Sequence, residues 1–153
     1  MPSVPVTKGP RQVPRRIAQL PTWLLAQANA RGHRLLTEAF ARHGVRGYHY
    51  RLLAALDESG PASQITLSRH TGIDRSDVVA AVNDLESSGL LTRSSDAQDR
   101  RRNTIAITAT GSARLAELDD VVAGVQEALL APLSPRDRTE LLRLLSHLSD
   151  PPA

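Results

Sequence analysis

The sequence predicts a mainly α-helical protein that carries one small β-hairpin, an α+β arrangement. Three observations support this fold class. Apolar residues recur at helical spacing along most of the chain, glycines interrupt that pattern at intervals, and two short strand-like stretches flank a polar, arginine-rich segment near residue 100. A chain of 153 residues buries about 68–70% of the surface that it exposes when unfolded, so we expect a real core.

The composition narrows the classes of protein to consider. The chain has no cysteine, which excludes a disulfide framework, a thiolate zinc site and a thiol redox switch. It has no apolar run long enough to cross a bilayer and no apolar leader, so we expect a cytoplasmic protein without membrane contact. Only Trp23, Phe40, Tyr48 and Tyr50 are aromatic, so the core must be aliphatic.

The first part of the chain is predicted to hold a tail and two helices. Residues 1–16 are rich in proline and almost free of periodic apolar residues, which is typical of a flexible, mildly basic tail. Apolar residues then recur at helical spacing from about residue 21 to residue 43, where Gly44 stops the helix. The stretch 48–57 predicts a second helix, which the Ser-Gly-Pro run 59–61 ends.

Two short helices joined by a tight glycine turn come next. The stretch "SQITLSRHTG" predicts a helix that Gly72 ends, because glycine readily adopts the left-handed conformation there. Asp74 is predicted to cap the following helix, which runs over about 74–88 to Gly89. Its buried stripe is expected to comprise Val78, Val82 and Leu85, with Ala81 beside them. This pair of helices is a helix-turn-helix signature, whose second helix recognises DNA in a major groove.

The face opposite that stripe is the candidate recognition surface. Helical geometry places Ser76, Ala80, Asn83 and Ser87 on it. Small residues permit close approach to a groove, where Ser76 can bond a base edge and Ala80 can meet a thymine methyl. Arg75 at the helix start can reach guanine or phosphate, and Asp77 either stabilises the first turn or accepts from cytosine. The candidate DNA contacts in this lobe are Ser63, Gln64, Arg75, Ser76, Asp77, Ala80, Asn83 and Arg93.

The arginine-rich segment follows this helix. "LLTRS" and "NTIAIT" predict two strands around the polar loop "SDAQDRRR", which makes a hairpin wing over about 94–103. Arginine suits a narrow, electronegative minor groove. Asp99 and Arg101 are two residues apart, so in an extended loop the carboxylate can orient the guanidinium, while Arg100 and Arg102 favour phosphates. The alternative is a solvated charged loop.

Two more helices are predicted after the hairpin. Thr108 can cap the first of them. Its apolar residues, spaced 3, 4, 3 and 4 apart as in a coiled coil, are Leu115, Leu118, Val122, Val125 and Leu129. Ser134 as cap, Pro135 at the first position and Asp137 in the first turn begin the last helix. Its apolar face comprises Leu141, Leu144, Leu145 and Leu148.

The chain resembles the MarR family of winged helix-turn-helix regulators over roughly residues 20–148. The resemblance rests on "GIDRSDVVAAVNDLESSGLLTR", on "DAQDRRRNTIAIT" and, more weakly, on "GYHYRLLAALDESGP". The family's wing motif is Asp, any residue, Arg, and then an apolar strand that ends in Leu-Thr. Asp99, Arg101 and Thr108 match this motif, and Ile107 replaces the leucine.

The resemblance implies a homodimer that binds a palindromic operator in double-stranded DNA, usually as a repressor of its own or a neighbouring gene. We therefore expect a tail over 1–16, an N-terminal dimerisation helix over 17–45, a DNA-binding lobe over 46–109 and C-terminal dimerisation helices over 110–149. Many members of the family release DNA when a small anionic aromatic effector binds between the dimerisation helices and the lobe. Candidates for such a site, by position alone, are Trp23, His33, Tyr48, His49 and Arg51.

Other functions are less well supported by the sequence. An architectural protein that coats DNA with low sequence specificity would also suit a face of small residues, and a protein-interaction module would not need the arginine wing. We expect no enzyme, no cofactor and no metal. The chain has no nucleophile elbow and no glycine-rich phosphate loop, and its five histidines lack ligand spacing. The absence of cysteine excludes peroxide sensing through a thiol.

Overall fold

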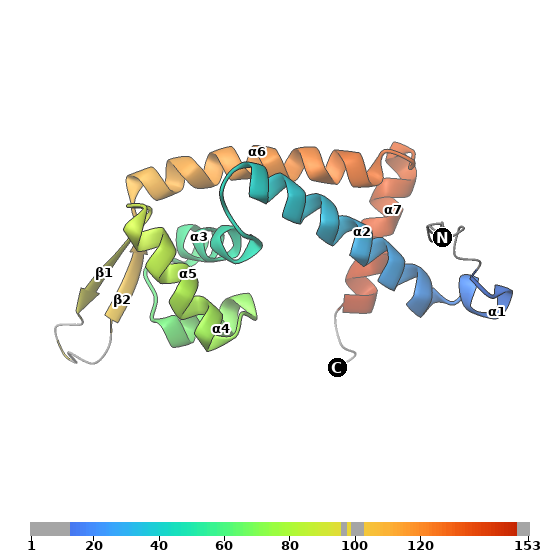
Figure 1. The fold of residues 1–153 in the computed structure, drawn as a ribbon. Helices are drawn as coiled ribbons and strands as arrows, with labels where there is room; N and C mark the ends of the chain where they lie inside the picture. The colour runs from blue at the N-terminus through green and yellow to red at the C-terminus, as the bar shows by residue number, and fades with distance from the viewer. Residues whose placement is uncertain (1–12, 96–97, 99–102, 150–153) are drawn as a thin grey trace, which may run out of the picture.

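The computed structural model describes residues 13–95, 98 and 103–149. It confirms the predicted fold class, because helices account for most of this part and the two strands form one antiparallel hairpin (Figure 1). The elements follow one another as α1 (Arg15–Ala18), α2 (Pro21–Arg42), α3 (Gly47–Ser59), α4 (Gln64–Thr71), α5 (Arg75–Ser87), β1 (Leu91–Ser95), β2 (Asn103–Ile107), α6 (Ala109–Leu130) and α7 (Pro135–Ser149).

The core lies in one lobe, where α3, α4, α5 and the hairpin pack around the end of α2 and the first half of α6. Figure 1 shows α6 running from this lobe to α7, with α2 beside it and with α1 and α7 at the end opposite the hairpin. The core is aliphatic except for Phe40, as the composition predicts. Its fully enclosed side chains include Leu52, Leu53, Leu56, Leu67, Val78, Val82, Leu91, Ile105 and Leu118.

The turn between α4 and α5 has the predicted glycine geometry. Gly72 has a φ of 66°, in the left-handed region, and its backbone N–H donates to the carbonyl of Ser68. Asp74 occupies the N-cap position of α5, but its side chain accepts no hydrogen bond from the helix, so that part of the prediction is wrong. The carboxylate is exposed and stays hydrated, and Asp77 supplies the negative charge of the first turn.

The hairpin is joined to the helix-turn-helix at its base. β1 and β2 pair antiparallel from Leu91 opposite Ile107 to Ser95 opposite Asn103. Ala62, in the link between α3 and α4, exchanges two backbone hydrogen bonds with Ile105, at 3.0 and 2.8 Å. The buried side chain of Ile105 also enters the core of the lobe. The base of the wing is therefore fixed relative to the helices.

The start of α6 is tightly packed against the turn that precedes β1. As predicted, Thr108 caps the helix, because its hydroxyl accepts from the N–H of Gly111 at 2.9 Å and donates to the carbonyl of Gly89 at 2.8 Å. A Cβ on Gly111 would lie 2.2 Å from the carbonyl oxygen of Leu90. Only glycine allows this close approach of helix and turn.

The apolar seam of α6 packs within the chain, which corrects its interpretation as a coiled-coil seam between chains. Leu115 and Leu118 are buried in the core of the lobe, and Val122 packs against that core. Val125 is also buried, and the side chain of Leu129 approaches Gly32 of α2. The spacing of 3 and 4 residues identified the buried face of this helix correctly, but the lobe and α2 cover it.

The described segments nearest the two termini, residues 13–25 and α7, expose apolar side chains that do not pack into the lobe. No residue of α7, all of which is described, is buried, and Leu142, Leu144 and Leu148 are 62, 47 and 70% exposed. Residues 15–18 form the single turn α1, so Arg15 and Arg16 are helical although they fall within the segment 1–16 predicted as a flexible tail. Residues 1–12 lie outside the described part. Exposed apolar side chains of this end are Val13, Ile17, Leu20, Leu24 and Leu25. Of the helices that the structure describes, none has the length and apolarity to cross a membrane.

Candidate nucleic-acid interface

The outer face of α5 is the centre of the candidate interface. Ser76, Ala80, Asn83 and Ser87 are exposed, as predicted, while Val78, Ala81, Val82 and Leu85 are buried. Sequence analysis missed Val79, whose side chain is 40% exposed beside Ala80. Its position three residues after Ser76 was the available signal, because residues three apart lie on one side of a helix.

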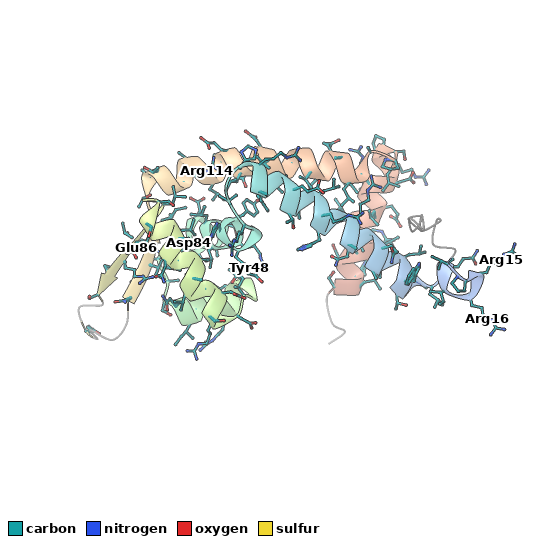
Figure 2. The ribbon with its side chains drawn as sticks, in the orientation of Figure 1. Arg15, Arg16, Tyr48, Asp84, Glu86 and Arg114 are labelled. Carbon is teal, nitrogen blue, oxygen red and sulfur yellow. The ribbon has the colours of Figure 1, made fainter. Side chains whose placement is uncertain are left out.

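Two of the predicted DNA contacts bind each other. Arg93, in β1, donates through Nη2 to Oδ1 of Asn83 in α5, and its Nε lies 3.5 Å from Oε2 of Glu86. The Nε of Arg93 is buried and makes no hydrogen bond within the described part of the chain. Arg93 therefore holds β1 against α5, at the place where Figure 2 labels Glu86.

The first turns of α4 and α5 hold the other predicted contacts. The hydroxyl of Ser63 accepts from the N–H of Thr66 at 3.2 Å, so this side chain serves as the N-cap of α4. Gln64 begins that helix and is half-buried. The side chains at the start of α5 are Arg75 and Ser76, which are exposed, and Asp77, which is half-buried. Within the described residues, Arg75 has no hydrogen bond or ion pair.

The predicted residues of the wing tip, Asp99, Arg100, Arg101 and Arg102, lie outside the described residues. The described strands on either side of them end at Ser95 and begin at Asn103.

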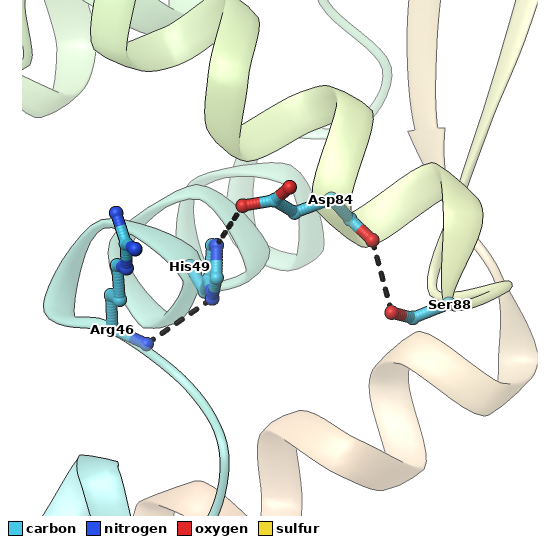
Figure 3. Close-up of polar contacts among 4 residues, drawn as sticks. All are labelled: Arg46, His49, Asp84 and Ser88. Atoms are coloured by element: carbon cyan, nitrogen blue, oxygen red, sulfur yellow. Dashed lines mark hydrogen bonds and ion pairs between the residues drawn. The ribbon is translucent and has the colours of Figure 1, made fainter.

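His49 joins α3 to α5. Its Nδ1 accepts from the backbone N–H of Arg46 at 3.2 Å, and its Nε2 lies 3.3 Å from Oδ2 of Asp84 (Figure 3). Because Nδ1 accepts, Nε2 carries the proton and donates to the carboxylate. His49 is only 8% exposed. It lines a cleft of about 630 Å³ between the loop after α2 and the end of α5.

The structure brings together only part of the predicted effector site. The guanidinium carbon of Arg51 lies 5.3 Å from the centre of the Tyr48 ring, and Nη1 of Arg51 donates to the carbonyl of Thr71 at 3.2 Å. Trp23 is half-buried and His33 is exposed, both on α2. Within the described part of the chain, no hydrogen bond, ion pair or ring contact joins either of them to the other three candidates.

Tyr50 links the lobe to the long helix α6, and sequence analysis assigned it no role. Its hydroxyl donates to Oδ1 of Asp119 at 2.9 Å, and its ring packs against Phe40 at 5.6 Å between centroids. Burial of the phenol and the neighbouring carboxylate of Asp119 raise the pKa of Tyr50 above its ordinary value. The two partners are 69 residues apart, so no local pattern could have revealed this contact.

The described residues do not assemble a metal centre. No group of three or more histidine, aspartate or glutamate side chains in this part of the chain could hold an ion. Both ring nitrogens of His49 are engaged in hydrogen bonds, with the backbone of Arg46 and with Asp84, so neither is free to bind a metal ion.

Comparisons with known proteins agree on one family. A model of the MarR family matches residues 43–102. A protein of Thauera aromatica, assigned to transcriptional regulation of the hcr operon, is 33% identical over 105 residues. That match covers 69% of this chain and 63% of the relative, so the chain spans less than two thirds of the relative's length.

Solved structures extend the similarity to nearly the whole chain. A Pseudomonas aeruginosa protein assigned as a transcriptional regulator is 31% identical, with a TM-score of 0.74 over 85% of this chain and 97% of that one. The transcriptional repressor CouR, solved on a 23-mer DNA duplex, is 26% identical, with a TM-score of 0.79 over 89% of this chain and 96% of that one. These three relatives are regulators of transcription.

Proposed function

Because the chain belongs to the MarR family, we propose that it is a dimeric, effector-responsive transcriptional regulator that represses its own or a neighbouring gene. In this proposal, α5 enters the major groove of a palindromic operator and the hairpin wing approaches the adjacent minor groove. The relative CouR, which was solved on DNA, supports double-stranded DNA as the partner.

The outer face of α5 is the observation that carries this proposal. Ser76, Ala80 and Asn83 are exposed at the centre of that face, with Arg75 at the helix start. No long charged side chain projects from these central positions, so a DNA groove can approach the helix closely. The hairpin is fixed beside the same helix through Arg93.

Footprinting on the DNA upstream of the protein's own gene and of its divergent neighbour tests the proposed function. We expect two protected half-sites about 10 base pairs, or one helical turn, apart. Protection that spreads evenly along any duplex would instead favour an architectural protein with low sequence specificity.

The effector response rests on Tyr48 and Arg51. Tyr48 is 38% exposed, and the neighbouring guanidinium of Arg51 offers a cation beside an aromatic ring. This pair suits a small anionic aromatic molecule. Titrating benzoate into the footprinting reaction tests the response, since protection that persists at saturating benzoate would speak against this effector class.

We further propose that Arg101 of the wing enters the minor groove and that Asp99 orients it. The Arg101→Ala substitution is expected to weaken operator binding by about 1–3 kcal/mol per half-site, as for a good base-edge contact. Asp99→Ala is also expected to weaken binding, although it removes a negative charge that would face DNA. Operator affinity measured at two salt concentrations checks both effects.

Arg100 and Arg102 provide matched controls for this wing prediction. Their alanine variants are expected to weaken operator and random DNA alike, and each to lower the slope of log affinity against log salt by about one unit. If Asp99→Ala binds the operator more tightly than the parent protein, the orienting role is wrong and the segment acts only as a cationic loop.

Dimerisation is proposed to use the exposed leucines of α7 and the exposed apolar residues of α1 and α2. A patch of this kind marks an interface in a soluble protein. We expect a sedimentation mass of about 33 kDa, twice the 16.6 kDa of one chain, and dissociation when Leu144 and Leu148 are both changed to Asp. Those side chains are 47 and 70% exposed within one chain, so the lobe is expected to stay folded.

The exposed residue Ser146 supplies a control in the same helix. Helical geometry places it on the side of α7 opposite Leu144 and Leu148, so the Ser146→Asp variant is expected to remain dimeric. A doubly substituted protein that still sediments as a dimer would show that this face of α7 is not the interface.

A further inference from the structure

The recognition helix exposes an apolar side chain at the centre of the proposed DNA interface. Val79 is 40% exposed, although it lies in a helix whose other valines, Val78 and Val82, are fully buried. It adjoins Ala80 and lies three residues after Ser76. An exposed valine next to an alanine gives this part of the face a surface of methyl groups.

Two of the polar side chains near this surface, Asn83 and Asp84, are already engaged within the protein. Asn83, one turn further along the helix, accepts from Arg93, which also lies against Glu86. Asp84 accepts from His49 on the other side of the helix. The bond from Arg93 takes one lone pair of the Asn83 amide oxygen and fixes the orientation of the carboxamide toward β1, so adenine would have to compete with Arg93 for this side chain. Arg75 is exposed and without a partner within the described residues, so it remains available to a polyanion.

The major groove offers one apolar group along its base edges, the C5-methyl of thymine. We propose that Val79 and Ala80 recognise thymine methyl groups, so that the operator half-site is selected largely by apolar contact. This inference rests on the proposed function, because it requires α5 to lie in the major groove. It also assigns Val79 as a specificity-determining residue and gives the operator a chemical requirement.

Removing single methyl groups from the DNA tests the inference. The full chain first selects its operator from a library of random duplexes, and each thymine of a half-site is then replaced by uracil, which pairs identically but lacks the methyl. At the contacted thymines, affinity measured by fluorescence anisotropy is expected to fall about fourfold per methyl, as for the loss of one buried apolar carbon. Cytosine at such a position is expected to weaken binding, and 5-methylcytosine is expected to restore part of the loss.

Protein variants assign the effect to Val79. In Val79→Ser, replacing thymine by uracil is expected to cause no further loss of affinity at one thymine of each half-site. The loss at the thymine that contacts Ala80 is expected to persist. Ala116→Ser, on α6 away from this face, is expected to keep both losses of affinity. Val79 and Ala116 are exposed, so thermal unfolding of both variants is expected to match that of the parent protein.

The results separate this inference from the proposed function. A selected operator whose affinity does not change when uracil replaces thymine overturns the methyl contacts and leaves a sequence-specific regulator. If uracil at every contacted position weakens binding of Val79→Ser as much as it weakens binding of the parent protein, the role of Val79 is overturned. Failure of the library to yield any preferred sequence overturns both the inference and sequence-specific regulation.

Discussion

The Leu118→Asp substitution is expected to unfold the lobe and not merely to separate two subunits. Leu118 is fully buried in the core, where α6 packs against the lobe formed by α3, α4, α5 and the hairpin. An unpaired carboxylate in this position costs several kcal/mol, which is a large part of the roughly 5–15 kcal/mol that stabilises a typical domain. Denaturant titration followed by circular dichroism should show a strongly reduced midpoint or no folded baseline.

Leu142→Asp provides the matched control for this prediction. The substitution is the same, but Leu142 is 62% exposed on α7, so the folded baseline and the denaturation midpoint of the lobe are expected to remain close to those of the parent. A Leu118→Asp protein that keeps the parent's stability and becomes monomeric would contradict the packing of α6 within its own chain. It would restore the interpretation of its apolar seam as a contact between subunits.

The Ala80→Glu substitution is expected to abolish specific DNA binding while leaving the fold intact. Ala80 is exposed at the centre of the outer face of α5, so a larger side chain has room in the free protein. In the complex, glutamate would bring both bulk and a negative charge against DNA. We expect operator affinity to fall by about two orders of magnitude or more, roughly 3 kcal/mol, in anisotropy titrations.

The exposed residue Ala116 on α6 allows the same change away from the proposed interface. Ala116→Glu adds an identical charge to the protein, so it controls for net charge and for helix propensity. It is expected to bind the operator nearly as well as the parent at physiological salt, where charges further apart than about 8 Å are screened. Unchanged operator affinity in Ala80→Glu would mean that α5 does not lie in a groove, and it would favour a protein-interaction module.

The sequence by itself determined most of the elements and many of their ends, because these depend on local chemistry, although it did not predict the single turn α1. The helix expected from about residue 21 to residue 43 is α2, Pro21–Arg42. Gly72 ends α4, Thr108 caps α6, and the strands of the hairpin lie on either side of the arginine-rich segment. Each of these outcomes follows from backbone conformations and hydrogen bonds that span only a few residues.

The arrangement of the candidate site was only partly accessible from the sequence. Periodicity placed Ser76 and Ala80 on the outer face of α5, and the structure agrees. Sequence analysis did not identify Val79 as exposed, because a valine beside a buried stripe is normally assigned to the core, although its spacing of three residues from Ser76 indicated the outer face. It also treated Asn83 and Arg93 as separate DNA contacts, although they are hydrogen-bonded to each other.

Only the tertiary structure decided which surface covers each apolar face. The spacing of Leu115, Leu118 and Val125 shows that one side of α6 is buried, but it carries no information about the partner. The contacts that settle the question join residues far apart in the sequence, such as Tyr50 with Asp119 and His49 with Asp84. Hydrophobic periodicity indicates which side chains are buried, because burial depends on their apolar surface. Which residues they pack against depends on the arrangement of the whole chain in the folded core.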